Sequence, residues 1–297
     1  MVMNADDRTK VNRVGSTAQR QSELPYEKRV CRIEAHYPPP VIPGEPFLAP
    51  SVEEYVEMID DAGFEVSIVS GEFNRGTPRF HSKMIPPHPN VDNDMLPKFL
   101  DLAHQKGIIV LSYYPIIFNK PLKAIHPEWL MQFLDNGRPE PENEGWFCYN
   151  SPHRDWLPEY LIEFMDNLDI DGFYFDDTNW GTHASRPWVP SCCCKYCEDL
   201  FREESGLQIP HKVDFDSIDF KHFVNWRYEK LKEALQHIFH QVKEKHPDAI
   251  LDLNSYMRPS TDWSDGHPLG SLELEKEAGY FFVETFRTHR EPSFTAK

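Results

Sequence analysis

An apolar run of aromatic residues that ends in two carboxylates is the sharpest chemical signal in this 297-residue sequence. The segment Asp171-Gly172-Phe173-Tyr174-Phe175-Asp176-Asp177 predicts a strand too apolar to be exposed, with both acids at its end. Because successive side chains of a strand point to opposite faces, only one acid can face a central site, and Asp176 is our candidate for catalysis. Either acid could instead have a structural role, in which it caps a turn or accepts hydrogen bonds from backbone N–H groups. Asp177 is retained as a candidate for substrate binding.

Cleavage of a glycosidic bond needs a second carboxyl group, because one acid donates a proton while the other acts as nucleophile or activates water. Glu284 ends an aromatic run at 280–285 and is the preferred partner of Asp176. Glu72 follows an earlier apolar run and is the next candidate, retained for substrate binding. Either glutamate could instead be a solvated acid at the rim of the fold.

Carbohydrates are recognised by aromatic platforms and by polar groups that bind hydroxyls. Trp180 lies four residues beyond Asp176 and is the tryptophan that we expect to line a site. Three further polar residues at strand ends are candidates for substrate binding: His36, Tyr113 and Asn254. The alternatives are that the aromatic residues fix long loops to the fold and that the histidine is a structural group.

Four of the six cysteines lie within six residues, and three of them have the spacing of a metal site. Cys192, Cys194 and Cys197 fall in one short turn, where three thiolates can converge on a tetrahedral Zn²⁺. Cys148, which lies before the predicted helix at 154–168, can supply the fourth ligand. Four thiolate ligands leave no position for water, so we expect a structural zinc ion that joins two long loops. The alternative is a set of free thiols.

These residues also carry a resemblance to known families, over about residues 30–290. Cys148, the segment Asn150-Ser151-Pro152, the acidic strand end and the clustered cysteines resemble the family 42 β-galactosidases. In that family four cysteines in this arrangement hold a zinc ion. The Asn-Glu pair that carries the acid/base of that family is replaced here by Asp176-Asp177-Thr178, so that assignment is not transferred.

The Asp-Gly-x-x-x-Asp strand resembles instead the α-L-fucosidases of families 29 and 151 and the barrels labelled hypothetical glycosyl hydrolase 6. In those fucosidases the aspartate that ends the fourth strand is the nucleophile of a retaining mechanism. The resemblance therefore implies this role for Asp176, on a glycoside hydrolase barrel. It points to a fucoside-like or galactoside-like substrate. Our hypothesis is a retaining, exo-acting glycoside hydrolase in which Glu284, chosen from its position at a strand end, is the acid/base.

The elements that must position these residues alternate between strands and helices. Apolar runs predict strands, amphipathic runs predict helices, and alternation implies a parallel sheet with right-handed crossovers. No Gly-rich phosphate-binding turn follows any strand, whereas acids, amides and phenols do, as at the active end of a (β/α)8 barrel. We predict strands at 30–36, 65–70, 108–114, 172–175, 250–256 and 280–285.

Six strands are two short of a closed (β/α)8 barrel, and 12 residues follow the last strand. We therefore expect either an open barrel that lacks its last units or strands hidden in the long segment at 115–150, and we favour the first. Residues 1–28 have no apolar period and predict a flexible arm, with the barrel domain spanning 29–297.

A formal net charge of −17 disfavours nucleic acid and anionic lipid as partners. No apolar run suits a membrane span and no export signal is visible, so we expect a cytoplasmic protein. The sequence leaves homo-oligomers open. Two other functions stay open as well: a catalytically silent barrel that binds carbohydrate or serves as a scaffold, and a metal-dependent hydrolase using His36, Glu72 and Asp176.

Overall fold

Six parallel strands form one sheet in this computed structural model, in the order β1-β2-β5-β6-β9-β10. The structure describes residues 30–32, 50–73, 76–134, 146–180, 182–183, 186–256 and 279–284, with the backbone alone for 30–32, 93, 182–183, 186–190, 255–256 and 279–284. The strands are β1 (Val30–Arg32), β2 (Val66–Ser70), β5 (Ile109–Pro115), β6 (Gly172–Asp176), β9 (Ile250–Tyr256) and β10 (Gly279–Glu284). The predicted arm at 1–28 lies outside the described residues.

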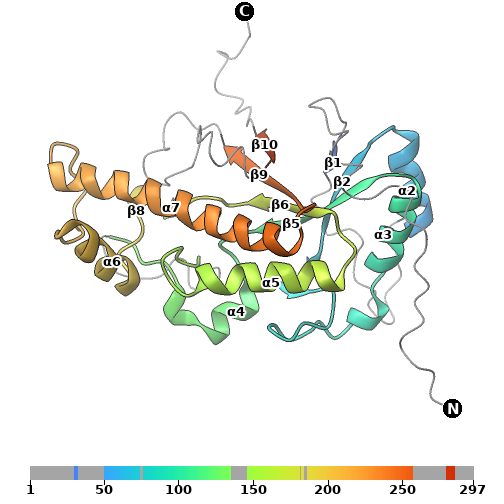
Figure 1. Cartoon of the computed structure of the whole chain (residues 1–297), viewed down its shortest axis with the longest axis horizontal. Helices are drawn as coiled ribbons and strands as arrows, with labels where there is room; N and C mark the ends of the chain where they lie inside the picture. The colour runs from blue at the N-terminus through green and yellow to red at the C-terminus, as the bar shows by residue number, and fades with distance from the viewer. Residues whose placement is uncertain are drawn as a thin grey trace, which may run out of the picture.

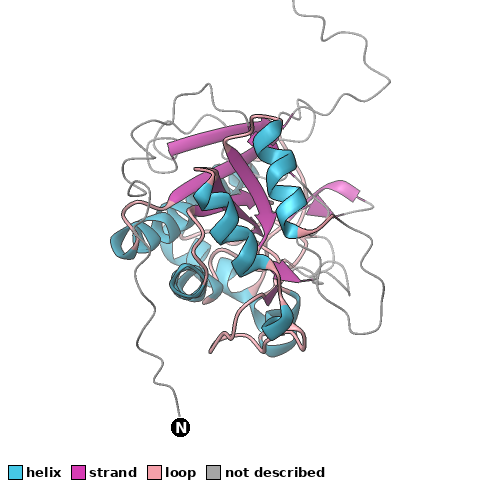
Figure 2. Cartoon of the chain, turned by 90° about the vertical axis from the view of Figure 1, so that its right-hand side faces the viewer, coloured by secondary structure: helices cyan, strands magenta, loops and turns pink. Residues whose placement is uncertain are grey.

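Helices connect the strands, as the alternating pattern predicts. They are α2 (Val52–Asp61), α3 (Leu96–Gln105), α4 (Lys120–Ile125), α5 (His153–Asn167), α6 (Lys195–Ser205) and α7 (Ile218–Lys245), with single turns η1 (Val91–Asn93) and η2 (Pro127–Trp129). Figure 1 shows α5 and α7 side by side along the sheet, with α2 and α3 beside β1 and β2. In Figure 2 the strands are twisted relative to one another, as in other parallel sheets.

The first helix shows how local sequence fixes an element boundary. The Ser51 hydroxyl accepts a hydrogen bond from the Glu54 N–H at 3.2 Å, and the Glu54 carboxylate accepts one from the Ser51 N–H at 2.8 Å. This capping box satisfies N–H groups that have no partner inside the helix. Val52, Val56 and Ile59 follow at helical spacing and are buried against the core.

The two faces of the sheet have different neighbours. Outward side chains, such as Val110, Phe173 and Leu251, belong to the main core formed with the helices. The opposite side chains form a second, smaller cluster on what we call the inner face: Val66, Ile68, Ile109, Leu111, Tyr174 and Ile250. Because faces alternate along a strand, Asp176 lies on the inner face, two residues after Tyr174.

Two short hairpins interrupt the loops that follow β2 and β6, and the sequence patterns do not predict them. β3 (Glu72–Phe73) pairs with β4 (Thr77–Pro78), and β7 (Thr182–His183) pairs with β8 (Arg186–Pro190). The described part of the segment at 115–150 contributes α4, η2 and isolated bridges, and adds no strand to the main sheet. Among the described helices, none has the length and hydropathy of a membrane span.

Candidate active site and cysteine cluster

Three hydrogen-bond donors converge on the carboxylate of Asp176. Its Oδ2 accepts a hydrogen bond from the Tyr113 hydroxyl at 2.8 Å, and its Oδ1 accepts one from the Asn254 side-chain amide at 2.9 Å. The backbone N–H of Asp177 donates to the same Oδ1 at 2.9 Å. These groups come from β5, β9 and the residue that follows β6, and together they hold one buried carboxylate in a fixed orientation.

The site lies at the carboxyl end of the strands, where barrel enzymes place their catalytic groups. Pro115 of β5 pairs with Asp176, and Phe175 pairs with Leu253 of β9, which puts Asp176 level with Asn254. The structure thus brings together three of the residues singled out in the sequence.

Asp177 has a structural part in this arrangement. Its φ of 54° lies in the left-handed region, which aspartate tolerates better than most residues. The turn directs its N–H at Asp176, and its carbonyl accepts a 3.5 Å hydrogen bond from the Tyr149 hydroxyl. The backbone of Asp177 therefore orients the Asp176 carboxylate.

Glu284 is the last residue of β10 and pairs in register with Tyr256 of β9. It stands two strands away from Asp176 and two residues further toward the carboxyl end. Usual strand spacing and rise put their Cα atoms roughly 12 Å apart on a flat sheet. The Glu284 side chain lies outside the described residues, and so does all of His36.

Glu72 lies away from this site. It is 2% exposed between the sheet and α5, and its Oε1 accepts a 2.9 Å hydrogen bond from Tyr160. Burial raises the pKa of Glu72 to about 8, so the side chain is largely protonated at neutral pH. The structure thus does not bring Glu72 to Asp176, and it gives no support to an ion held by both.

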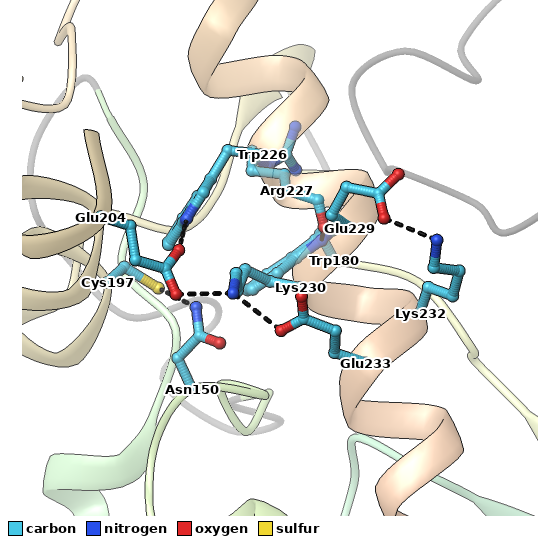
Figure 3. A network of polar contacts seen from close by, with 10 residues as sticks. All are labelled: Asn150, Trp180, Cys197, Glu204, Trp226, Arg227, Glu229, Lys230, Lys232 and Glu233. Carbon is cyan, nitrogen blue, oxygen red and sulfur yellow. Dashed lines mark hydrogen bonds and ion pairs between the residues drawn. The ribbon is translucent and has the colours of Figure 1, made fainter.

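Trp180 is also remote from any substrate surface, because it is fully buried. Its indole N–H donates to the carbonyl of Arg227 in α7 at 2.8 Å, and Tyr149 packs edge-on against it at 5.5 Å. Figure 3 shows Trp180 beside Arg227 against this helix. Trp180 therefore anchors the loop after β6, which is the alternative that the sequence left open for the tryptophans.

Asp252 was missed by the sequence reasoning. It lies two residues before Asn254 on the same face of β9, and it pairs in register with Tyr174. Burial raises the pKa of Asp252 to about 7. The signal was present in the alternation of β9, where Asp252 occupies a position that β5 and β6 fill with Tyr113 and Tyr174.

The four predicted cysteine ligands form one buried cluster. The Sγ atoms of Cys148, Cys192, Cys194 and Cys197 all lie within 4.8 Å of one another, and those of Cys148 and Cys197 are 3.4 Å apart. Tetrahedral zinc with bonds of about 2.3 Å requires sulfur separations of about 3.8 Å. The separation between Cys148 and Cys197 is too long for a disulfide, and the residues fit a four-coordinate metal ion. Cys193 points away and donates to the Phe133 carbonyl.

The surroundings of the cluster suit bound thiolates. Burial raises the pKa of Cys148, Cys192 and Cys197, whereas hydrogen bonds with these three thiols lower the pKa of Cys194. Backbone N–H groups of residues 132, 150 and 194 and the Asn150 amide donate to sulfur atoms at 3.3–3.4 Å, and Figure 3 shows the amide. Such donors stabilise negative charge on sulfur, which a metal ion would compensate.

The cluster is linked to the loop that follows Asp176. Tyr149 adjoins the ligand Cys148 and donates to the carbonyl of Asp177. Ser191 adjoins the ligand Cys192, and its hydroxyl donates to the carbonyl of Trp180. The loop is thus held at both ends by residues next to cysteine ligands.

Comparison with known proteins adds the following findings. Residues 51–177 match a family model described as "Hypothetical glycosyl hydrolase 6". The match includes Asp176 and Cys148 and ends before the other three ligands. A search of curated proteins finds no match.

Three solved structures share the fold. The α-L-fucosidase isoenzyme 2 from Paenibacillus thiaminolyticus has a TM-score of 0.57 at 20% identity, over 76% of this chain and 32% of that one. The PgaB (BpsB) glycoside hydrolase domain from Bordetella bronchiseptica has a TM-score of 0.63 at 13% identity, over 86% and 73%. A β-galactosidase from the haloarchaeon Halorubrum lacusprofundi has a TM-score of 0.58 at 14% identity, over 87% and 40%.

The chain spans about a third of the length of the fucosidase. At these identities the solved structures establish architecture alone. The described residues of this chain thus form part of a (β/α) barrel of the kind found in glycoside hydrolases, with a sheet that is not closed in the described part.

Proposed function

We propose that this protein is a glycoside hydrolase with Asp176 as its nucleophile. The observation that carries the proposal is the carboxylate of Asp176, held by Tyr113, Asn254 and its own following N–H at the carboxyl end of a central strand. A fixed carboxylate on the inner face of the barrel suits attack on an anomeric carbon. The match to a glycosyl hydrolase family over residues 51–177 supports the same chemistry.

The proposed reaction is a retaining, exo-acting hydrolysis. An Asp176 oxygen forms a bond to the anomeric carbon while the glycosidic bond breaks, and Glu284 donates its proton to the leaving oxygen. Water then attacks the glycosyl ester, gives its proton to Glu284 and releases Asp176. A separation of about 5 to 5.5 Å between the two carboxyl groups favours this course, and about 6.5 to 9.5 Å favours inversion.

The substrate in this proposal is a fucoside or a galactoside. The solved structures of similar fold include an enzyme named for each sugar, which is the reason to test these two first. A cytoplasmic location goes with the proposal as an expectation from the sequence.

The cysteine cluster would hold zinc in a structural role. Four thiolates complete a tetrahedral shell, so no position is left for substrate or water. The residues next to the ligands hold the loop after Asp176, and the metal would thereby fix the position of that loop.

Aryl α-L-fucosides and β-D-galactosides test the proposal directly. We expect turnover by the wild type and a loss of at least 1,000-fold in Asp176→Asn, which keeps the shape of the side chain but removes its negative charge. Asp101→Asn, at an exposed position of α3, makes the same chemical change away from the site and should leave turnover unchanged.

Full activity of Asp176→Asn would remove this residue from the mechanism. A wild type that binds sugars but cleaves none of the aryl glycosides would favour the other candidate function, a silent barrel that binds carbohydrate.

A further inference from the structure

We infer that Asp252 is a substrate-binding residue, whose neutral carboxyl group donates a hydrogen bond to a sugar hydroxyl held beside Asp176. The inference rests on the proposed function and adds a specificity-determining residue to it.

Strand register places Asp252 close to the nucleophile. Leu251 and Leu253 belong to the main core on the helix side, so Asp252 between them faces the inner side. Asn254, on the same face, donates to Asp176. Because Asp176 is level with Asn254 on the neighbouring strand, Asp252 lies diagonally from it, at a Cα separation of about 8 Å.

The side chain has hydrogen-bonding capacity that the described residues do not use. Its Oδ1 is buried and has no hydrogen-bond partner in the described part of the chain, although the residue as a whole is partly exposed. A buried polar atom without a partner is unfavourable, and a ligand hydroxyl can supply the missing bond. Asp252 is thus partly exposed to solvent and has a carboxyl oxygen that lacks a hydrogen-bond partner among the described residues.

Its neighbours favour the neutral acid. Among the side chains that the structure describes, the titratable groups on the neighbouring strands are Asp176 and Tyr174 on β6 and Tyr113 on β5. None of these described groups is a cation, and a hydrogen bond from the Leu253 backbone N–H, which lowers the pKa of Asp252, is outweighed by burial. Burial raises the pKa of Asp252 to about 7.

A neutral carboxyl group donates one hydrogen bond and accepts others, as a sugar hydroxyl does. An amide offers the same two functions without titrating. Replacing Asp252 by asparagine therefore separates the two roles, because an amide can bind a hydroxyl but cannot transfer a proton.

The experiment compares wild type, Asp252→Asn and Asp252→Leu, with Asp248→Asn as the exposed control that precedes β9. Affinities for L-fucose and D-galactose, which carry no charge, are measured by calorimetry from pH 5.5 to 8.5. The kcat and KM of the aryl glycoside that is cleaved are measured alongside.

We expect wild-type affinity for one of these sugars to fall above about pH 7 and the Asp248→Asn affinity to fall in the same way. Asp252→Asn should bind within about threefold of wild type at pH 6 and lose the alkaline fall. Asp252→Leu should bind at least tenfold more weakly and raise KM by a similar factor, with kcat changed less.

Wild-type affinity in Asp252→Leu would overturn the inference while leaving the proposed function intact. The inference would also be overturned if Asp252→Asn kept its activity toward dinitrophenyl glycosides but lost activity toward glycosides with poor leaving groups. That pattern is typical of the loss of a proton donor. A wild type that neither binds these sugars nor cleaves their glycosides would overturn both proposals.

Discussion

The protonated Glu72 between the sheet and α5 gives the sharpest stability prediction. Replacement by glutamine keeps the size of the side chain and removes the ionisation. In the folded protein burial raises the pKa of Glu72 to about 8, against 4.5 for the free side chain. Below pH 4.5 the acid is protonated in both the folded and the unfolded chain, so its ionisation has no effect on stability there.

Between pH 4.5 and 8 the unfolded chain loses this proton and the folded chain keeps it. The free energy of unfolding therefore falls as pH rises, by about 1.4 kcal/mol per pH unit. At pH 7 the accumulated cost is about 3 kcal/mol, and above pH 8 it levels off at about 5 kcal/mol. Glu72→Gln should recover most of the pH 7 cost, less whatever the new amide loses by burial.

Urea denaturation at pH 5, 7 and 8.5 measures the effect. The stability gap between Glu72→Gln and wild type should be under about 1 kcal/mol at pH 5 and near 3 kcal/mol at pH 7. Glu159→Gln makes the same substitution at an exposed site on α5 and should stay within about 0.5 kcal/mol at every pH. A gap for Glu72→Gln that does not change with pH would refute the reasoning, because it would show that ionisation is not the cause.

Three further outcomes are expected. Tyr113→Phe removes one donor to Asp176, so kcat for an aryl glycoside should fall by roughly 10- to 100-fold with little change in Tm, which activity assays and thermal melts together measure. Cys197→Ser should reduce the zinc content from about one ion per chain, measured by elemental analysis, and lower Tm, measured by calorimetry. Equal zinc content in the wild type and the variant would argue against zinc binding by the four cysteines. Hydrogen bonds to two aspartates, Asp171 among them, overcome burial and raise the pKa of His104 to about 9. His104→Gln should therefore lose up to roughly 3 kcal/mol below pH 6.5, a deficit that vanishes as pH rises through 9 in urea titrations.

Much of the fold follows from local patterns in the sequence. The Ser51-x-x-Glu54 pattern and the helical spacing of the apolar residues after it indicate a helix that begins directly after Ser51, as α2 does. Strand alternation also puts Asp176 and Asp177 on opposite faces, and the inner position of Asp176 follows once Tyr174 is seen to belong to the inner cluster. Cysteine spacing predicts the cluster for a similar reason, since three ligands lie in one turn.

Other placements depend on contacts that the sequence does not display. Glu72 follows β2, but the chain turns into the β3 hairpin and the side chain meets Tyr160 of α5, 88 residues later. Trp180 is close to Asp176 in the chain, yet its indole bonds to Arg227 of α7. In both cases a distant helix decides which side the residue faces. Asp252 lies inside a strand, whereas the polar residues that the sequence marks as candidates lie at strand ends.

The cysteine cluster also has a meaning for the unfolded chain. Cys148 and Cys197 are 49 residues apart, and the segment between them contains α5 and the whole of β6 with Asp176. Bridged by the proposed metal ion, these residues form a closed ring around the nucleophile strand. In an unfolded chain that keeps the metal on both cysteines, a ring of this size lowers the chain entropy by an amount worth about 4 kcal/mol at 25 °C. A metal that is released on unfolding would instead add its binding free energy to the stability of the fold around the nucleophile strand.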